Sequence, residues 1–265
     1  MTVLFDQIRA VLRRDFLIDA RYRVAFLIAL ADAGVVLLSY SFLAGVFGDR
    51  RPDGYEPLPF LLVGIAVTDS LTTALVCLAL GARSSQQPGT VKALLALPLS
   101  PARLMLISLA YPLLRGAVDF VIFMTAGCWL GVPCGAMHLS AVVVTFVLAV
   151  GSVCVLGLLS AAFAMVFKRG DPVLWAVGAV TWLLSGVLYP TTVLPTWLQA
   201  ASWLLPATHA LTAMRAAVID GAPWAVLAPQ LLALTMFNVI GIPVGLWVYS
   251  VAVTHARRAG TLGHA

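Results

Sequence analysis

The chain has 265 residues, of which 62% are hydrophobic and only 10% are charged, against about 25% charged residues in soluble domains. Several apolar runs exceed the roughly 18 residues that mark a membrane-crossing helix, so the composition excludes a soluble globular protein and indicates a multi-pass membrane protein. The net charge of +5 does not indicate nucleic-acid binding, because most basic residues flank the apolar runs.

The first 23 residues predict an amphipathic helix that lies in the membrane interface. Leu4, Ile8, Leu12 and Phe16 recur every four residues, while arginines and aspartates fill the opposite side. The alternative is an amphipathic helix that packs on another domain, but the sequence offers no such domain. This charged start, followed by a long apolar run, also lacks the features of a cleaved signal peptide.

The apolar runs predict an all-α, polytopic chain with one transmembrane domain, 1–265, and six transmembrane helices. These spans cover about 24–47, 58–81, 104–131, 139–167, 173–188 and 225–253. Residues 189–224, the proline-rich segment, do not fit a single span, because Pro190, Pro195 and Pro206 interrupt it. Since broken backbone at membrane depth needs protein or water partners, we expect short re-entrant or interfacial helices there.

Basic residues beside the spans predict the orientation, because they gather on the cytoplasmic side of membrane proteins. One side carries twelve of them: Arg9, Arg13, Arg14, Arg21, Arg23, Arg83, Lys92, Arg103, Lys168, Arg169, Arg257 and Arg258. The other side carries Arg50 and Arg51, together with Arg215 if the proline-rich segment faces it. We therefore expect both termini in the cytoplasm and the proline-rich segment at the outer face.

Four ionisable residues fall inside the predicted spans: Asp32, Asp69, Arg115 and Asp119. Such groups are costly in a bilayer and tend to face the bundle interior and to pair. The spacing of Arg115 and Asp119 predicts an ion pair within one helix, and Asp69 and Arg115 could meet near the midplane. Two interpretations stay open, a polar lining that contacts a substrate and a salt bridge that holds the helices together.

Two Gly-x-x-x-Gly pairs, Gly127/Gly131 and Gly241/Gly245, permit close contact between helices. The spacing alone fits a dimer face and internal packing equally well.

No catalytic constellation is evident. The sequence has no Gly-Lys-Ser/Thr nucleotide loop, no His-Glu-x-x-His and no Gly-x-Ser-x-Gly motif, so we expect neither an enzyme nor a metal site. We interpret the four cysteines as small buried residues, with Cys128 and Cys134 left as candidates for an external disulfide. His209 has no neighbouring His or Cys, and we interpret it as a structural hydrogen-bonding residue.

Residues 82–103, between the second and third spans, predict a short cytoplasmic helix. Thr90 can cap a helix over 91–97 that Pro98 ends, and Ser100 can cap the next helix. An exposed and mainly apolar helix needs a partner groove. The alternative is a helix that lies on the membrane surface.

Two motifs make a family resemblance specific. Residues 88–100 read PGTVKALLALPLS, and SGVLYP at 185–190 is followed by LPTWL, LPATHAL, Arg215 and Gly221. The first resembles the Gly-Thr-hydrophobic-Glu-x-Leu-Leu-x-x-Pro-Leu-Ser segment of ABC-2-type transporter permeases, and the second resembles the outer signature of that family. With the amphipathic N-terminus and six spans, the resemblance covers nearly the whole chain.

The resemblance implies two functional segments. In the family the first motif is a coupling helix that docks on an ATP-hydrolysing subunit, here Gly89, Thr90, Val91, Lys92, Leu94, Leu95, Pro98 and Leu99. Lys92 stands where the family often has Glu, which puts the polarity of that contact in doubt. The second forms re-entrant helices that close the outer end of the pathway, here Gly186, Tyr189, Pro190, Leu194, Pro195, Trp197, Pro206, Thr208, His209 and Arg215.

The leading hypothesis is a permease subunit of an ATP-driven exporter in the bacterial inner membrane. Its cargo would be amphipathic or lipid-linked: a drug-like molecule, a glycolipid or a polysaccharide. The expected partners are a separate ABC ATPase that binds ATP and Mg, a second identical or related permease, and membrane lipids, with no cofactor held by this chain and no nucleic acid.

Three alternatives belong to other classes. An ion-coupled secondary transporter could use Asp32, Asp69 and Arg115 as a relay, but it would predict paired broken helices, and only one strongly broken region is present. A membrane-embedded enzyme would need convergent catalytic groups, which the sequence does not offer. A purely structural protein would leave the proline-rich segment without a role.

Overall fold

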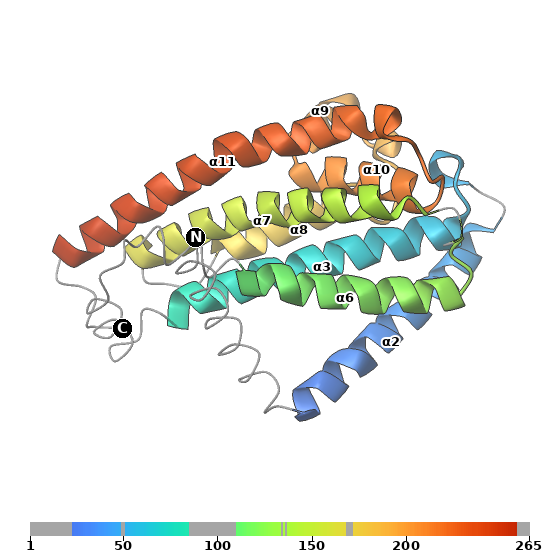
Figure 1. The fold of residues 1–265 in the computed structure, drawn as a ribbon, viewed down its shortest axis with the longest axis horizontal. Coiled ribbons are helices and arrows are strands. Elements are labelled where there is room, and N and C mark those ends of the chain that lie inside the picture. Colours follow the sequence, from blue (N-terminus) through green and yellow to red (C-terminus); the bar gives the residue numbers. More distant parts are fainter. Residues whose placement is uncertain are drawn as a thin grey trace.

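The computed structural model describes residues 23–48, 51–84, 110–133, 135, 137–167 and 172–258, which form an elongated bundle of helices (Figure 1). No strand occurs within these ranges. The predicted N-terminal amphipathic helix and the coupling residues from Gly89 to Leu99 lie outside the described residues. The predictions about them therefore remain predictions.

Six helices overlap the predicted spans. They are α2 (Arg23–Phe47), α3 (Pro57–Ser84), α6 (Ala110–Trp129), α7 (Leu139–Phe167), α8 (Pro172–Leu184) and α11 (Trp224–Arg258). Three stretches of the described residues are long and apolar enough to cross a membrane: Pro57–Leu78, Leu139–Phe163 and Trp224–Ala252. Shorter apolar helices cover Ala33–Phe47 and Trp175–Leu184. The all-helical membrane architecture is confirmed, and six complete spans stay a prediction.

The fifth predicted span is shorter than expected. We predicted it over 173–188, but α8 ends at Leu184 after 13 residues, which is about 20 Å of helix against a hydrocarbon core of about 30 Å. The helix ends because Gly186 has a φ of +76°, a left-handed conformation that interrupts helical hydrogen bonding.

Three short helices connect α8 to α11: η3 (Thr191–Val193), α9 (Thr196–Trp203) and α10 (Pro206–Val218). Each begins at a proline, since Pro190 and Pro195 precede η3 and α9 directly and Pro206 is the first residue of α10. Proline suits these positions because the backbone N–H groups at the start of a helix have no intrahelical acceptor, so the N–H that proline lacks is not missed. The prolines therefore set the corners of the proline-rich segment, as the sequence predicted.

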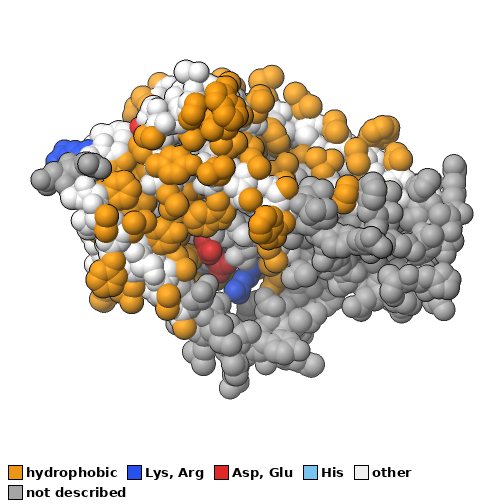
Figure 2. Space-filling model, turned by 180° about the vertical axis from the view of Figure 1, so that it is seen from behind, with side chains coloured by type: hydrophobic (Ala, Val, Ile, Leu, Met, Phe, Trp, Pro, Cys, Tyr) orange, Lys and Arg blue, Asp and Glu red, His pale blue; other side chains and the backbone are white. Residues whose placement is uncertain are grey.

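The bundle is built around α3, and α11 lies at its edge. The apolar stretch of α3 is 72% buried and that of α11 only 22%. The exposed apolar side chains of α11 follow one face of the helix: Leu232, Met236, Val239, Ile240, Val244, Trp247 and Val251. From behind, apolar side chains cover most of the described surface, and acidic and basic side chains gather in one hollow (Figure 2). Such a surface suits lipid rather than water.

Glycines allow the helices to approach closely, which matters because helix contacts in lipid depend on packing rather than on the hydrophobic effect. A Cβ at Gly241 would lie 2.9 Å from Val155, and one at Gly245 would lie 3.2 Å from Leu158, both on α7. This pair therefore serves internal packing. Gly131 lies beyond the end of α6 with a φ of +111°, so the other predicted pair does not line a helix face.

Candidate functional site

The proline-rich segment lies near the end of the bundle where α3, α7 and α11 begin (Figure 1). It follows a bend at residues 185–188, directly after α8. A Cβ at Gly186 would lie 2.9 Å from Thr191 Cγ2, so the bend leaves no room for a side chain there. The hydroxyl of Tyr189 donates a hydrogen bond to the carbonyl of Leu183, which ties the bend back to α8.

Side chains of α9 form hydrogen bonds with the residues that precede and follow this helix. The Gln199 amide donates to the carbonyl of Leu194 at 2.7 Å. Ser202 Oγ donates to the carbonyl of Leu184 at 2.7 Å and lies 3.2 Å from Thr208 Oγ1 on α10. Pro195 and Trp197 are exposed. Helix α9 is therefore fastened to α8 and α10 by its inner side, while its outer side stays open.

His209 joins three helices. Its Nδ1 lies 2.5 Å from Gln230 Oε1 on α11, and its Nε2 lies 2.8 Å from the carbonyl of Trp203 at the end of α9. The indole of Trp203 packs edge-on against the imidazole at a centroid distance of 5.9 Å. Both ring nitrogens have partners, so the geometry is that of a structural residue.

Helix α10 begins deep inside the bundle. Leu205, Pro206 and Ala207 line a small cavity of about 30 Å³ together with Val177 and Thr181 of α8. Val177 lies about 10 Å back along α8 from its end at Leu184. Ser202 links Thr208 of α10 to the carbonyl of Leu184, so the first turn of α10 lies beside the last turns of α8.

From this starting point α10 runs within the protein. Ten of its 13 residues are buried, and they pack against α3, α7 and α11. Leu211 and Met214 are fully buried.

Arg215 joins α10 to the start of α3 and to the bend. Its side chain is only 5% exposed. Nε donates to the carbonyl of Phe60 at 3.3 Å, Nη2 donates to the carbonyl of Val187 at 3.0 Å, and the guanidinium lies 3.5 Å from the centroid of the Phe60 ring. A buried cation requires such partners, because its desolvation is otherwise uncompensated. We call Arg215, Phe60 and Val187 the arginine node.

Next to the arginine node, α3 has no room for a side chain at position 64. A Cβ on Gly64, one turn after Phe60, would lie 2.6 Å from Arg215 Nη2 and 2.8 Å from the carbonyl of Val187. Burial lowers the pKa of the Arg215 guanidinium, and the charge of Asp53 opposes that shift. The lowered pKa is about 9, so the arginine keeps its positive charge at neutral pH.

A second link joins the same elements next to the arginine node. The Tyr55 hydroxyl donates to the Asp220 carboxylate at 2.6 Å, and the Tyr55 ring stacks on Phe60 at 6.5 Å between centroids. Burial, followed by this hydrogen bond, raises the pKa of Tyr55 above its usual range. Two links thus join these elements. The Arg215 guanidinium binds Phe60 in the first turn of α3, and the Asp220 carboxylate binds Tyr55 just before α3.

The start of α7 is attached to the other side of the segment. The backbone N–H of His138 donates to the carbonyl of Ala217 at 3.0 Å, and its Nδ1 lies 3.1 Å from the carbonyl of Ala222. Sequence reasoning identified Arg215 but missed Tyr55, Phe60, His138 and Asp220. These residues lie in three separate stretches with no shared motif, so no sequence signal marks them as partners.

The intramembrane polar residues lie at one level of α3 and α6. Arg115 Nη2 and Asp119 Oδ1 are 3.7 Å apart, so the predicted pair within α6 is present. A Cβ on Gly116 would lie 2.9 Å from the carbonyl of Ser70, which brings Arg115 to the level of the half-buried Asp69. A contact between Asp69 and Arg115 stays a prediction. The side chain of Asp32 lies outside the described part of the chain.

Cys128 takes part in a disulfide, while Cys77 and Cys154 do not. Of the two interpretations given above for Cys128, the structure therefore supports a disulfide and not a small buried residue, since Cys128 is exposed. Its proposed partner, Cys134, lies outside the described residues. Among the residues that the structure does describe, no group of three or more His, Cys, Asp or Glu could hold a metal ion.

Comparison with known proteins agrees with this geometry. The family model described as ABC-2 type transporter matches residues 6–219, which include the predicted coupling residues, the arginine node and all of α10. No curated protein matches the chain. The chain therefore belongs to the ABC-2 type transporter family, as a multi-pass membrane permease.

Proposed function

We propose that this permease is the membrane subunit of an ATP-driven exporter in the bacterial inner membrane, with both termini in the cytoplasm. The proline-rich segment then acts as a gate at the outer end of the pathway. The carrying observation is the course of α10, which begins beside the last two turns of α8 and runs buried between α3, α7 and α11. A short helix in this position is re-entrant, and it can close the pathway without crossing the membrane.

Helix α3 is the natural link between the gate and the energy source. Its first turn carries Phe60 of the arginine node, and it continues for 28 residues, about 42 Å, to Ser84, directly before the coupling segment. A push on the coupling residues Gly89 to Leu99 would therefore reach the gate as a rigid-body movement of α3.

The energy has to come from another protein under this proposal. The sequence has no nucleotide-binding loop, so ATP and Mg would be held by an ABC ATPase subunit that docks on the coupling helix. Two permeases, identical or related, would enclose one pathway within membrane lipids. The apolar surroundings of the pathway suit an amphipathic or lipid-linked cargo such as a drug-like molecule, a glycolipid or a polysaccharide.

The test combines complex formation with a conformational readout. The permease is co-expressed with the ATPase encoded beside it and reconstituted in nanodiscs, with a spin label on Trp197→Cys, which is exposed on α9. We expect ATP and vanadate to change the distance between the labels of two copies by several ångströms. Leu94→Asp should abolish both ATPase binding and this change, while the helical content stays normal.

The ion-coupled alternative predicts the opposite result. If a proton or sodium gradient changes the label distance in the permease alone, and ATP with the partner has no effect, the exporter proposal fails. Arg115→Gln provides a control, because it would block an ion relay but leaves the coupling residues intact.

A further inference from the structure

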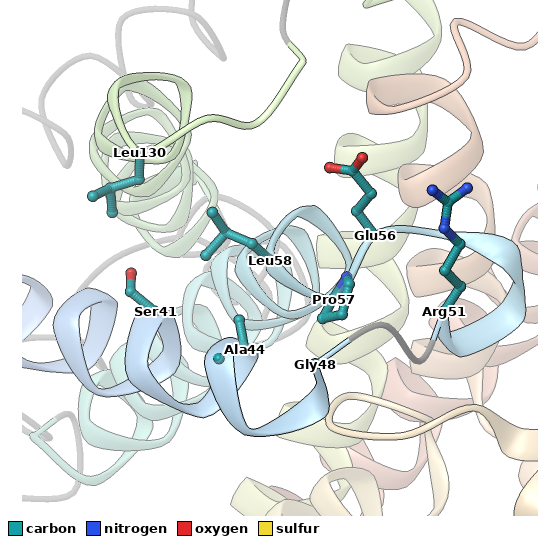
Figure 3. A pocket seen from close by; sticks show the side chains of 9 residues that line it. Ser41, Ala44, Gly48, Arg51, Glu56, Pro57, Leu58 and Leu130 are labelled. Carbon is teal, nitrogen blue, oxygen red and sulfur yellow. The ribbon is translucent and has the colours of Figure 1, made fainter.

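An open groove lies beside the gate, between the end of α2, the start of α3 and the end of α6. Its volume is about 690 Å³, within the range of about 300 to 1,000 Å³ typical of small-molecule sites. Figure 3 shows Leu58 and Leu130 on one side and Arg51 and Glu56 on the other, with turns of α2 below. The mechanism proposed above does not use this groove.

The groove exists because α2 carries small residues where it passes α3. Ala44, Gly45 and Gly48 line it, and nothing lies within 4 Å of a Cβ placed on Gly45. Ser41 also lines it, but its hydroxyl is already used by the carbonyl of Leu37 at 2.8 Å. The α2 side of the groove is therefore apolar and open.

The groove crosses the boundary of the apolar region. The membrane-crossing stretch of α3 starts at Pro57, so Leu58 lies within it and Glu56 lies just outside. On α2 the apolar stretch Ala33–Phe47 contains Ala44. One part of the groove thus lies at the level of lipid tails, and the other lies at the level of lipid headgroups.

The polar part offers opposite charges. Arg51 and Glu56 are both exposed, and their side chains extend in the same direction from the residues that lead into α3 (Figure 3). A guanidinium binds phosphate oxygens through paired N–H donors, and a carboxylate accepts hydrogen bonds from an ammonium group. The matching ligand carries a phosphate and a primary amine a few ångströms apart, with an apolar tail.

We propose that this groove binds an aminophospholipid, a zwitterionic lipid of the phosphatidylethanolamine type. Its phosphate lies at Arg51, its ammonium lies at Glu56, and one acyl chain runs along Leu58 and Leu130 over Ala44 and Gly45. An anionic lipid without an amine would bring a phosphate toward the Glu56 carboxylate with nothing to offset the repulsion. A choline headgroup has no N–H to donate to that carboxylate.

The test compares lipids that share the same acyl chains. The full-length permease is purified in detergent and titrated with dioleoyl phosphatidylethanolamine, phosphatidylglycerol or phosphatidylcholine, and bound lipid is counted by native mass spectrometry. We expect phosphatidylethanolamine to bind more tightly than the other two by about three-fold or more, as for exposed charge pairs. Equal binding of all three, or a preference for phosphatidylglycerol, would overturn the proposal.

Two substitutions on one helix locate the site. Gly45→Leu fills the groove, whereas Gly34→Leu places the same side chain in open space about three turns away on the same face of α2. Gly45→Leu should lose the phosphatidylethanolamine adduct, and Gly34→Leu should keep it. Retention of the adduct by Gly45→Leu would place the lipid elsewhere and refute the proposal.

Charge substitutions provide an independent readout that does not depend on packing. Because Glu56 is exposed, Glu56→Gln leaves the fold intact, and it should reduce the preference for phosphatidylethanolamine over phosphatidylglycerol. Arg51→Gln should weaken both lipids, because both carry the phosphate. An unchanged lipid preference in Glu56→Gln would contradict the assignment of the ammonium to this carboxylate.

Discussion

Arg215 Nη2 lies 3.0 Å from the carbonyl oxygen of Val187, although the two residues are 28 positions apart in the chain. Val187 belongs to the bend that ends α8, and Arg215 lies in the last turn of α10. The hydrogen bond therefore joins the two ends of the proline-rich segment, and the second donor of the same guanidinium attaches them to Phe60 of α3.

Arg215→Met should destabilise the permease by about 2–4 kcal/mol, because two buried carbonyls lose their donor and the Phe60 ring loses its cation. Arg215→Lys should recover only part of this loss, since an ammonium lacks the planar fork that reaches both carbonyls at once. Thermal unfolding in detergent, followed by tryptophan fluorescence, measures the series. Equal melting temperatures for the lysine variant and the native protein would show that charge alone is sufficient.

Gly64→Ala should disturb the same contact from the side of α3. The added methyl would lie 2.6 Å from Arg215 Nη2, closer than any normal contact. We expect a lower melting temperature, and we expect the loss to be smaller when Arg215 is already methionine, because one of the two clashing groups is then absent and only the carbonyl of Val187 remains. Gly178→Ala is the control, since nothing lies within 4 Å of its Cβ. Additive effects of Gly64→Ala and Arg215→Met would argue against a shared contact.

The helices could be predicted from the sequence because the length of an apolar run is a local property. The predicted fourth span, 139–167, coincides with α7 (Leu139–Phe167). The fifth was predicted four residues too long, because the apolar residues continue through the bend and conceal the left-handed Gly186. Composition reports how apolar a stretch is, and it does not report where the backbone turns.

The partners of the candidate site were harder to predict for a different reason. Arg215 was identified through its place in the motif, but it binds backbone carbonyls of Phe60 and Val187, and every residue carries a carbonyl. Position 64 on α3 requires glycine because Arg215 of α10 lies against it. The residues beside Gly64 in the sequence do not predict this contact. Only the three-dimensional arrangement identifies these residues.

Tyr55→Phe should remove the hydrogen bond to Asp220 and cost about 0.5–1.5 kcal/mol, because the ring stacking on Phe60 is kept. The effect should also depend on pH. The folded-state pKa of Tyr55 is raised, so the contribution of the protonated phenol is complete below the ordinary tyrosine pKa of about 10 and is lost as the pH rises toward the folded-state value.

Melting curves of Tyr55→Phe and the native protein from pH 7 to 11 test this dependence. The difference in melting temperature should be constant up to about pH 9.5 and should shrink above the ordinary tyrosine pKa of about 10. Asp220→Asn is the matched variant, since it keeps a hydrogen-bond acceptor but removes the charge. A difference that grows between pH 8 and 11 would have the wrong sign for this linkage.

Arg115→Gln and Asp69→Asn test whether the intramembrane polar residues hold helices together or contact cargo. The packing role is favoured by the close approach of α6 to α3 beside these residues, where a Cβ on Gly116 would lie 2.9 Å from the carbonyl of Ser70. Arg115→Gln leaves the Asp119 carboxylate without its cation in an apolar environment, so it should lower the yield of folded protein several-fold, and we predict the same direction for Asp69→Asn. Fluorescence-detected size-exclusion chromatography measures that yield.

The double variant Arg115→Gln with Asp119→Asn distinguishes packing from cargo contact, because it removes both charges of the pair and leaves neither one unpaired. We expect its yield to be higher than that of Arg115→Gln alone. The folded fraction should also keep the native pattern of ATPase stimulation across a panel of amphipathic compounds, assayed with the partner ATPase. Normal yield with an altered stimulation pattern would instead assign these residues to the pathway wall.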